Sequence, residues 1–392
     1  MSGEFTAFPV GQGDAFFLRR DNGTTILVDG GSSLIGLSSQ LSALFPSQSI
    51  DVVVCTHADK DHCEGLIGLL EQAIHTVKEV WLPGRWLDRL EDLCKHGCDF
   101  LTELAKNIME SDCREFGKAI TDGTEDIPRE PECEQSFANI EDALESDDDS
   151  SCWCDACCVF DTFILFSNRF PHKSHVKSWS AAVNTAKRIK RLTMAAHHHG
   201  AQIRWFDFEE YQRQKAPSGG ESFLQPMNAV ELTQQVVRKK LSALRFVELT
   251  LDNRESLVFL APETKQDSSV LFTSDSNLKF CFSVGSLQRI MLATAPHHGS
   301  EDNAPAYTYI ATAIAKVQKP NRTYWVRSDG CYKIRPGATY LAQQKRVCTW
   351  CRGTSLSKQR VQLTDVPSWQ LKAGIQGCHC ERRITQQDSV LT

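Results

Sequence analysis

The sequence has no stretch of about 18 uninterrupted apolar residues, which is the length that a membrane-spanning helix needs. Residues 1–17 also lack a basic segment followed by an apolar one, the pattern of a secretory signal. No repeat of about 20–50 residues is visible, which argues against a solenoid. We therefore expect a soluble chain that is not exported and that resides in the cytoplasm.

Neither sign of charge dominates, because 43 basic and 49 acidic side chains leave a formal net charge of −6. This balance does not exclude a nucleic acid partner, since phosphates respond to local basic patches and to bound cations more than to the total charge. Cysteine is plentiful, with 16 residues. In a long chain without a signal segment, we interpret these cysteines as reduced thiols, some of them buried or bound to metal.

The length of 392 residues suits two units, or one αβ domain with a large insertion. Near the start, apolar runs at 15–18 and 25–28 flank an Asp-Asn-Gly turn and predict a β-hairpin. A helix is expected to begin at Cys63 or Glu64. Short β-branched or apolar runs predict further strands, at 51–55, 77–82, 256–260, 269–273 and 290–294.

Between residues 85 and 248 the pattern changes to helix-like stretches, which indicates a mainly helical insertion. Its acidic segment 122–158 is best interpreted as a solvated loop, although its cysteines could form a cluster: Cys152, Cys154, Cys157 and Cys158. A basic stretch around Trp179 could follow a phosphate backbone, but one face of a surface helix is the preferred interpretation. Its cations are Lys173, Lys177, Lys187, Arg188, Lys190 and Arg191.

Four metal-ligand side chains, His57, Asp59, Asp61 and His62, lie directly after the predicted strand 51–55. Imidazole and carboxylate bind divalent zinc, manganese or iron, and one ion would not need all four. Such density is typical of a dinuclear site, in which ions about 3.5–4 Å apart share bridging ligands. The alternative, a solvated His- and Asp-rich turn, is disfavoured by the alternating and adjacent spacing.

Two later segments repeat the arrangement of a ligand after an apolar strand. Asp275 follows the run 269–273, while His297 and His298 follow the run 290–294. Strand ends are where a rigid scaffold presents site residues. The sequence therefore predicts that three separate strand ends converge on one pair of cations.

These residues resemble the metallo-β-lactamase superfamily, and within it the group that contains the metallo-hydrolase domain of the competence protein ComEC. The resemblance rests on blocks that follow the family's order: 10–15, 26–31, 57–66, 253–258, 273–275 and 296–300. It implies an α/β (α+β) fold, the αββα sandwich of the family. The expected parts are a metal-binding domain of 1–84 and 249–335, the insertion 85–248, and a C-terminal extension 336–392 that could bind zinc.

The resemblance also implies the metal ligands. His57 and Asp59 are expected to bind the first ion, Asp61 and His62 the second, and Asp275 both. Asp61 would also orient the attacking water. The expected cofactors are two divalent ions, zinc or manganese.

Roles for neighbouring residues follow from the same resemblance. His298 is the favoured ligand of the second ion, and His297 the favoured contact to phosphate or proton donor, although the reverse assignment stays open. Gln12, Asp14 and Asp29 are expected to support the metal loop by hydrogen bonding.

Three features depart from the family pattern. Asp59 stands where the commonest motif has histidine, which favours a harder ion such as manganese. Ser274 stands where glycine is usual, so the backbone of that turn could differ. The further histidine that the superfamily often supplies has only the cluster 197–199 as a candidate, and a surface or helix-terminal tract is the preferred interpretation.

The leading functional hypothesis is a phosphodiesterase or nuclease that cleaves DNA or another nucleic acid through a metal-bridged hydroxide. One alternative is a hydrolase of a small phosphoester, cyclic nucleotide, lactone or thioester. The other is a metal-bound regulatory or assembly partner in a multi-protein system, with a protein docking on the insertion 85–248.

Two close cysteine pairs near the C-terminus, Cys348 with Cys351 and Cys378 with Cys380, resemble the spacing of structural zinc sites. The second pair departs from the usual C-x-x-C spacing. The sequence leaves two interpretations open, an additional structural zinc site and reduced, partly buried cysteines.

Overall fold

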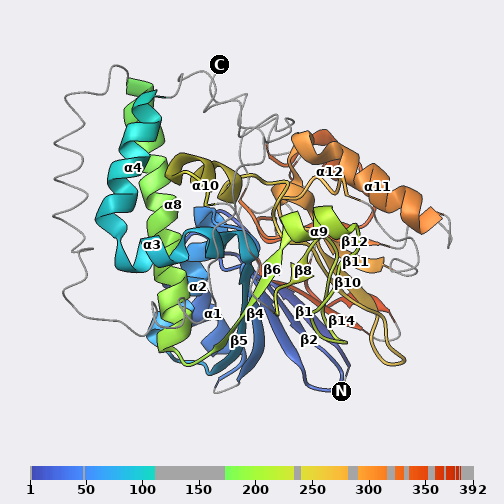
Figure 1. Cartoon of the computed structure of the whole chain (residues 1–392). Helices are drawn as coiled ribbons and strands as arrows, with labels where there is room; N and C mark the ends of the chain where they lie inside the picture. The colour runs from blue at the N-terminus through green and yellow to red at the C-terminus, as the bar shows by residue number, and fades with distance from the viewer. Residues whose placement is uncertain are drawn as a thin grey trace, which may run out of the picture.

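Two β-sheets stack face to face and carry helices on their outer faces (Figure 1). The computed structural model describes residues 2–46, 49–110, 173–233, 240–280, 290–315, 323–330, 335–351, 358–365, 368–375, 377–378 and 380. This architecture is the αββα sandwich that the resemblance implied, so the expected fold class is confirmed.

The first sheet contains nine strands in the described part of the chain, in the order β15-β14-β1-β2-β3-β4-β5-β6-β8. Strands β1 to β3 pair antiparallel, and β3 to β6 pair parallel. Its strands are β1 (Glu4–Ala7), β2 (Phe16–Arg19), β3 (Thr25–Val28), β4 (Ile50–Val54), β5 (Val77–Pro83), β6 (Gln202–Asp207), β8 (Val230–Glu231), β14 (Val361–Asp365) and β15 (Trp369–Leu371).

The second sheet has the order β13-β12-β11-β10-β9-β7 among the described residues. Strands β10 to β13 run parallel, so their carboxyl ends lie at one edge of the sheet. Its strands are β7 (Gln225–Pro226), β9 (Phe259–Ala261), β10 (Ser269–Phe272), β11 (Ile290–Thr294), β12 (Tyr324–Arg327) and β13 (Arg346–Cys348).

Helices cover both outer faces. Those on the first sheet are α1 (Gly36–Leu44), α2 (Lys60–Gln72), α3 (Leu90–Lys95), α4 (Gly97–Glu110), α8 (Lys173–His198) and α10 (Ala243–Thr250), as Figure 1 shows. The second sheet is covered by α11 (Ala304–Ala315) and α12 (Ala338–Leu341). The short helices η1 (Gly84–Asp88), α9 (Phe208–Gln214), η3 (Pro296–Gly299) and η4 (Glu301–Asn303) lie in connections. None of the helices in the described part of the chain combines the length and the apolar character that crossing a membrane requires.

The apolar runs of the central strands supply two cores at once. In β3, Leu27 packs in the core under the helices, whereas Ile26 and Val28 pack in the core between the sheets. Neighbouring residues of a strand point to opposite faces, so a strand that is covered on both sides must be apolar throughout. This explains why the strands that position the site could be recognised as short apolar runs.

The predicted elements agree with the structure in most places. The hairpin is confirmed as β2 and β3, and the runs at 51–55, 77–82, 269–273 and 290–294 are confirmed as β4, β5, β10 and β11. The predicted start of the following helix was wrong, because α2 begins at Lys60. Its first turn carries polar ligand candidates that do not display the apolar period of a helix.

The predicted strand 256–260 was also misplaced, since β9 spans Phe259–Ala261. The preceding residues make other contacts: Leu257 donates its backbone N–H to Thr56 O, and Val258 donates to Asn228 Oδ1. The predicted domain boundaries stay a prediction, but strands from all three predicted segments enter the two sheets. Strands β6, β7 and β8 come from 85–248, and β13, β14 and β15 come from 336–392.

Candidate metal centre

The loop 57–62, which we call the metal loop, follows strand β4 and includes the first turn of helix α2. The thiols of Cys55 and Cys63 both donate hydrogen bonds to His57 O, and these bonds hold the backbone at the start of the loop. Asp29 accepts hydrogen bonds from the backbone N–H and the hydroxyl of Thr56. Asp61 and His62 lie in the first turn of α2. The loop is therefore fixed at both ends before any ligand binds.

Three buried histidines of the site each have the Nδ1 atom close to a side-chain oxygen. His62 Nδ1 lies 2.8 Å from Asp29 Oδ2, and His298 Nδ1 lies 3.1 Å from Asp14 Oδ1. His57 Nδ1 lies 3.1 Å from Thr56 Oγ1. Fixing one ring nitrogen sets the direction of the other. Each Nε2 atom is thus directed at the centre of the site.

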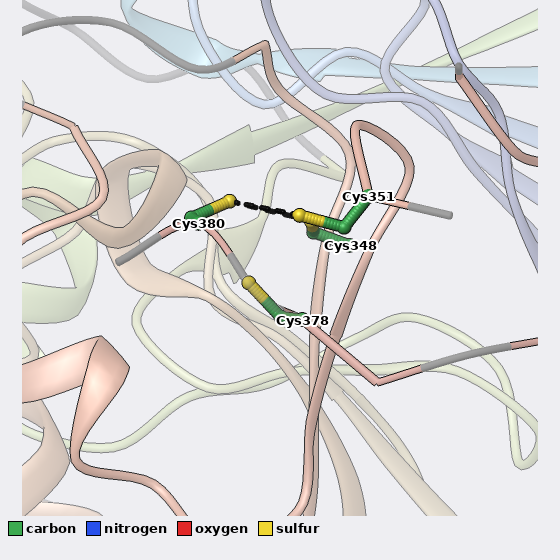
Figure 2. A group of neighbouring side chains, drawn as sticks. All are labelled: Cys348, Cys351, Cys378 and Cys380. Carbon is green, nitrogen blue, oxygen red and sulfur yellow. Dashed lines mark hydrogen bonds between the residues drawn. The ribbon is translucent and has the colours of Figure 1, made fainter. Parts of the chain in front are cut away.

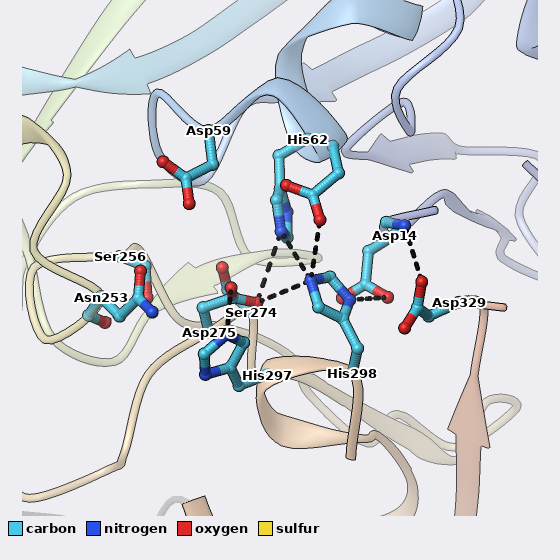
Figure 3. A network of polar contacts seen from close by, with 12 residues as sticks. Asp14, Asp59, His62, Asn253, Ser256, Ser274, Asp275, His297, His298 and Asp329 are labelled. Atoms are coloured by element: carbon cyan, nitrogen blue, oxygen red, sulfur yellow. Dashed lines mark hydrogen bonds and ion pairs between the residues drawn. The ribbon is translucent and has the colours of Figure 1, made fainter. Parts of the chain in front are cut away.

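Asp275 lies at that centre, between the loop 57–62 and the histidine pair (Figure 3). Its Oδ1 atom is 3.4 Å from the Nε2 atoms of both His62 and His298. Its Oδ2 atom is 3.7 Å from His57 Nε2, and Asp59 Oδ2 is 3.6 Å from that same nitrogen. One carboxylate therefore faces two sets of ligand atoms.

These side chains form two overlapping groups whose ligand atoms lie within 4.8 Å of one another. The first group contains His57, Asp59 and Asp275. The second contains Asp14, His62, Asp275 and His298. Asp14 contacts the Nδ1 atom of His298, so the Nε2 atom remains directed at Asp275.

The nitrogen and oxygen atoms at the centre are arranged better for binding divalent cations than for hydrogen bonding to one another. His57 Nε2 and Asp275 Oδ1 are buried and have no hydrogen-bond partner. The Nε2 atoms of His62 and His298 face each other at 3.3 Å. Buried polar atoms left unpaired are costly, and separations of 3.4–3.7 Å exceed good hydrogen bonds. Cations between these atoms would satisfy them.

Asp61 and Gln12 lie at the margin of the second group. Asp61 Oδ2 is 3.5 Å from His298 Nε2 and accepts a hydrogen bond of 3.4 Å from Gln12 Nε2. Among the described residues, Asp61 is outside both of the groups whose ligand atoms lie within 4.8 Å. The structure thus places Gln12 against Asp61, Asp14 against His298 and Asp29 against His62.

The two adjacent histidines have different surroundings. The side chain of His298 is 1% exposed and lies inside the second group, whereas that of His297 is 26% exposed. His297 Nε2 is 3.4 Å from Asp275 Oδ2, and its Nδ1 is 3.2 Å from Asn303 Oδ1. The assignment of His298 as ligand and His297 as phosphate contact or proton donor stays a prediction, and the structure places only His298 inside a group of ligand candidates.

Four residues of the site have left-handed backbone conformations: Asp29 (φ 58°), Ser274 (φ 49°), His297 (φ 46°) and His298 (φ 53°). Such conformations are unfavourable for residues other than glycine and gather at functional sites. Ser274 therefore adopts a conformation in which glycine is favoured. Its hydroxyl donates to Thr56 Oγ1 at 2.7 Å, an interaction that glycine could not make.

The acidic groups create a strong preference for positive charge. Burial works to raise the pKa of Asp275, but His298, His297 and His62 hold it well below its usual value. Burial likewise works to lower the pKa of His298, but Asp275 and Asp14 raise it to about 10. The pKa of His62 is raised well above its usual value against burial, by Asp275 and Asp29. Without metal, the centre therefore holds protons that a cation would replace.

The basic stretch of α8 is occupied with structural contacts. Arg188 Nε donates to Ala58 O in the metal loop at 2.9 Å, and Arg191 pairs with Glu71. Trp179 is 2% exposed and packs in the core under the helices, so it offers no face to a nucleic acid base. Side chains of residues 173–177 lie outside the described part. The preferred interpretation, a helix face, fits these contacts.

The cluster 197–199 lies at the end of α8 and outside both His/Asp groups. Val77 donates its backbone N–H to His199 Nε2, and His199 Nδ1 contacts Leu70 O. His199 thus joins the end of α8 to α2 and to the start of β5. This matches the helix-terminal interpretation.

Sequence reasoning missed several residues around the centre. Asn303 donates to the carbonyl groups of Asp275 and Ser276, and Asp329 accepts from the backbone N–H of Gly13. Asp329 follows β12, so the recurring pattern of an acid after an apolar strand could have indicated it. Nothing comparable marks Asn303.

A small pocket beside His57 was also missed. It is lined by polar and aromatic side chains, including Arg85, Glu255, Trp86 and Phe208. Arg85 pairs with Glu255, Asp88 and Glu209. Burial raises the pKa of Glu255, partly against Arg85. One side of the pocket, next to the first group of ligands, is therefore formed by the ion pair of Arg85 and Glu255.

The four C-terminal cysteines also come together, in a group separate from the His/Asp groups. None of them is disulfide-bonded, and neither are Cys55, Cys63 and Cys94, whereas Cys98 is disulfide-bonded. The expectation of reduced cysteines is therefore wrong for Cys98. The cysteines of the segment 122–158, Cys152, Cys154, Cys157 and Cys158, lie outside the described residues.

Comparison with known families bears on the first part of this site. Residues 8–102 match the metallo-beta-lactamase superfamily. The matched segment holds Asp14, Asp29 and the loop 57–62, and it covers less than half of the chain. No curated protein matched the chain. The superfamily domain and the His/Asp groups together indicate a metal-dependent hydrolase.

Proposed function

We propose that the chain is a dinuclear metal-dependent phosphodiesterase of the ComEC-like group, and that it acts on DNA or another nucleic acid. The observation that carries the proposal is Asp275, whose two oxygens face two separate sets of ligand atoms. Two divalent ions, zinc or manganese, would supply Lewis-acid activation of water and of the phosphate at this point. The three acids Asp59, Asp61 and Asp275 make the site suitable for hard ions.

The chain's own residues divide the remaining work. Asp61, which Gln12 contacts, would orient a water molecule at the margin of the second group. His297 has its Nδ1 atom against Asn303 and its Nε2 atom beside Asp275. An imidazole in this position can contact phosphate and deliver a proton to the leaving oxygen.

The side chains of the site that are most exposed to solvent indicate from which side substrate can enter. The side chain of Asp59 is 33% exposed and that of His297 is 26% exposed, whereas His57, His62 and His298 are buried. Substrate would therefore approach between Asp59 and His297. An open edge suits a long polymer better than an enclosed cavity does.

Two of the basic side chains of α8 already have partners within the protein. Arg188 and Arg191 are engaged with the metal loop and with Glu71. Substrate would be held chiefly by the ions and by His297. We therefore expect binding without strong sequence preference.

Cleavage of single- and double-stranded DNA, with manganese and with zinc, tests the proposal. We expect the wild type to cleave at least one form, and Asp61→Ala and Asp275→Ala to lose this activity. Asp302→Ala is the matched control, because Asp302 is an exposed acid near the site but outside both ligand groups. Intact DNA in every condition with the metal-loaded wild type would contradict the proposal.

A second candidate, hydrolysis of a small phosphoester, cyclic nucleotide, lactone or thioester, is favoured by the pocket beside His57. The pocket has room for little more than a water-sized group, and its Arg85 and Glu255 pair with each other next to the first ligand group. Cleavage of a nitrophenyl phosphodiester without any cleavage of DNA would favour this candidate. Retention of metal without turnover of either substrate would instead favour a regulatory or assembly role, with a protein partner on the segment 85–248.

A further inference from the structure

Four cysteine sulfurs meet on the outer side of the second sheet (Figure 2). Cys348, Cys351, Cys378 and Cys380 are all buried, and their sulfur atoms lie within 4.8 Å of one another. The Sγ atom of Cys380 is 3.7 Å from that of Cys348 and 3.3 Å from that of Cys351. In a tetrahedral zinc site with bonds of about 2.3 Å, sulfur atoms are roughly 3.8 Å apart. The cluster thus already has about the size of such a site.

The two cysteine pairs are separated in the sequence by two strands that belong to the other sheet. After Cys348 and Cys351, at the end of β13, the chain forms β14 and β15 in the other sheet. It then returns, and Cys378 donates its backbone N–H to Arg346 O in β13 at 3.1 Å. The cluster therefore joins the two ends of a segment that crosses from one sheet to the other and back.

A chain of hydrogen bonds links the cluster to the His/Asp centre. Thr349, between the first two cysteines, donates its N–H to Arg327 O. The buried side chain of Arg327 in turn donates to His298 O and to Asp329. A ligand that holds Cys348 and Cys351 in place would therefore also support Arg327, which contacts the carbonyl group of His298.

Alternative explanations account for the cluster less well. A disulfide would join two sulfurs and leave two thiols, whereas none of the four is disulfide-bonded and all four sulfurs lie close to one point. Simple apolar burial does not require four residues from two distant segments to direct their sulfur atoms at each other. Thiols are weak hydrogen-bond partners, so the contacts between them would contribute little.

We propose that Cys348, Cys351, Cys378 and Cys380 bind one structural zinc ion, separate from the His/Asp centre. The zinc ion closes the segment that contains β14 and β15 and holds these two strands, of which β15 is the edge strand, on the sandwich. It also stiffens the support of Arg327 behind His298. Four thiolates leave no open position for a substrate, so this ion is structural.

Elemental analysis of the full chain, purified from zinc-supplemented cells, tests the proposal. We expect the wild type to carry one more zinc ion per chain than the double variant Cys351→Ser/Cys380→Ser. Cys94→Ser, which removes a buried thiol outside the cluster that is not disulfide-bonded, should keep the wild-type content. Equal zinc contents of the wild type and the double variant would overturn the proposal.

A second measurement avoids cysteine variants, in case the double variant does not fold. X-ray absorption at the zinc edge is recorded on Asp275→Ala, which is expected to lose the ions of the His/Asp centre. We expect a shell of sulfur alone, at about 2.3 Å. A shell of nitrogen and oxygen, or a zinc-free chain in which mass spectrometry finds Cys348 disulfide-bonded to Cys351, would overturn the proposal. This test is independent of any activity of the His/Asp centre.

Discussion

Each of the three buried histidines has its Nδ1 atom beside an oxygen and its Nε2 atom turned to Asp275. The sequence could predict the ligand candidates, because imidazole and carboxylate cluster after recognisable strands. It could not predict that Asp29 would contact His62 or that Asp14 would contact His298. These pairs are separated by 33 residues in one case and by most of the chain in the other, so only the fold brings them together.

Asp29→Asn tests the importance of these fixed nitrogens. The amide can still accept from Thr56, but it no longer presents a charged acceptor to His62 Nδ1. We expect the affinity for the second ion to fall about 10- to 100-fold. Competition with a chelator of known affinity measures the change, with Asp302→Asn as the matched control. Unchanged affinity in Asp29→Asn would show that the contact does not orient the ligand.

The raised pKa of His298 leads to a prediction about pH. In the metal-free protein it rises from 6.5 to about 10, because Asp275 and Asp14 outweigh burial. The stabilisation from the protonated ring is then fully present below pH 6.5 and is lost as the pH rises through about 10. We expect the melting temperature of the metal-free protein to fall over this range.

Metal-loaded protein provides the control for this prediction. Bound cations replace the proton on His298, so the fall in melting temperature between pH 6.5 and about 10 should be much smaller. Thermal unfolding of both forms in matched buffers makes the comparison. A metal-free protein whose melting temperature is constant or rises over that range would contradict the pKa assignment.

At the scale of elements, α8 braces the metal loop. Its Arg188 donates to Ala58 O between two of the proposed ligands, and α8 packs on α2. The basic residues of α8 could be recognised from the sequence, but their partners could not, because Ala58 lies 130 residues away. A basic helix face is a common surface feature, so its charge alone does not reveal what it contacts.

Arg188→Ala separates bracing from nucleic acid binding. We expect a weaker affinity for metal, because the loop 57–62 loses the hydrogen bond to Ala58 O, and little change in the salt dependence of DNA binding. Arg191→Ala is the matched control, since its partner Glu71 is exposed and such pairs contribute about 0–1 kcal/mol. A lower salt dependence with unchanged metal affinity would instead place Arg188 on a phosphate.

Strands at or next to the edges of the first sheet were not predicted from the sequence. Strand β14 alternates buried and half-buried residues, and β15 has three residues, so neither forms a continuous apolar run. Strand β6 begins with half-buried and exposed residues next to Arg204, whose guanidinium pairs with Glu79 and Glu231. Central strands are covered on both sides and are therefore easier to recognise than strands near an edge.

At the scale of the whole molecule, the site depends on residues from the two sheets meeting at one edge. The sequence indicated this convergence, since three strand ends each carry ligand candidates. The contacts that lock the sheets together were not predictable. Ser328 donates its hydroxyl to Phe8 O, and Gly13 donates its N–H to Asp329. These contacts join residues more than 300 positions apart.

Arg327→Met tests this connection. The guanidinium of Arg327 is fully buried between His298 O and Asp329, so its removal takes from this buried carboxylate its nearer cation, at 3.0 Å, and leaves it with Arg335 at 3.7 Å and the N–H of Gly13. We expect a loss of about 3–5 kcal/mol in the free energy of unfolding. Denaturant unfolding measures it. The double variant Arg327→Met/Asp329→Leu should recover part of the loss, and no loss in the single variant would contradict the connecting role.

The most direct test of the central claim is anomalous diffraction from crystals of the metal-loaded protein. The structure predicts two peaks about 3.5–4 Å apart on either side of Asp275, one next to His57 and Asp59 and the other next to His62 and His298. Loaded crystals without a peak at Asp275, or with the loop 57–62 turned away from His298, would contradict the account.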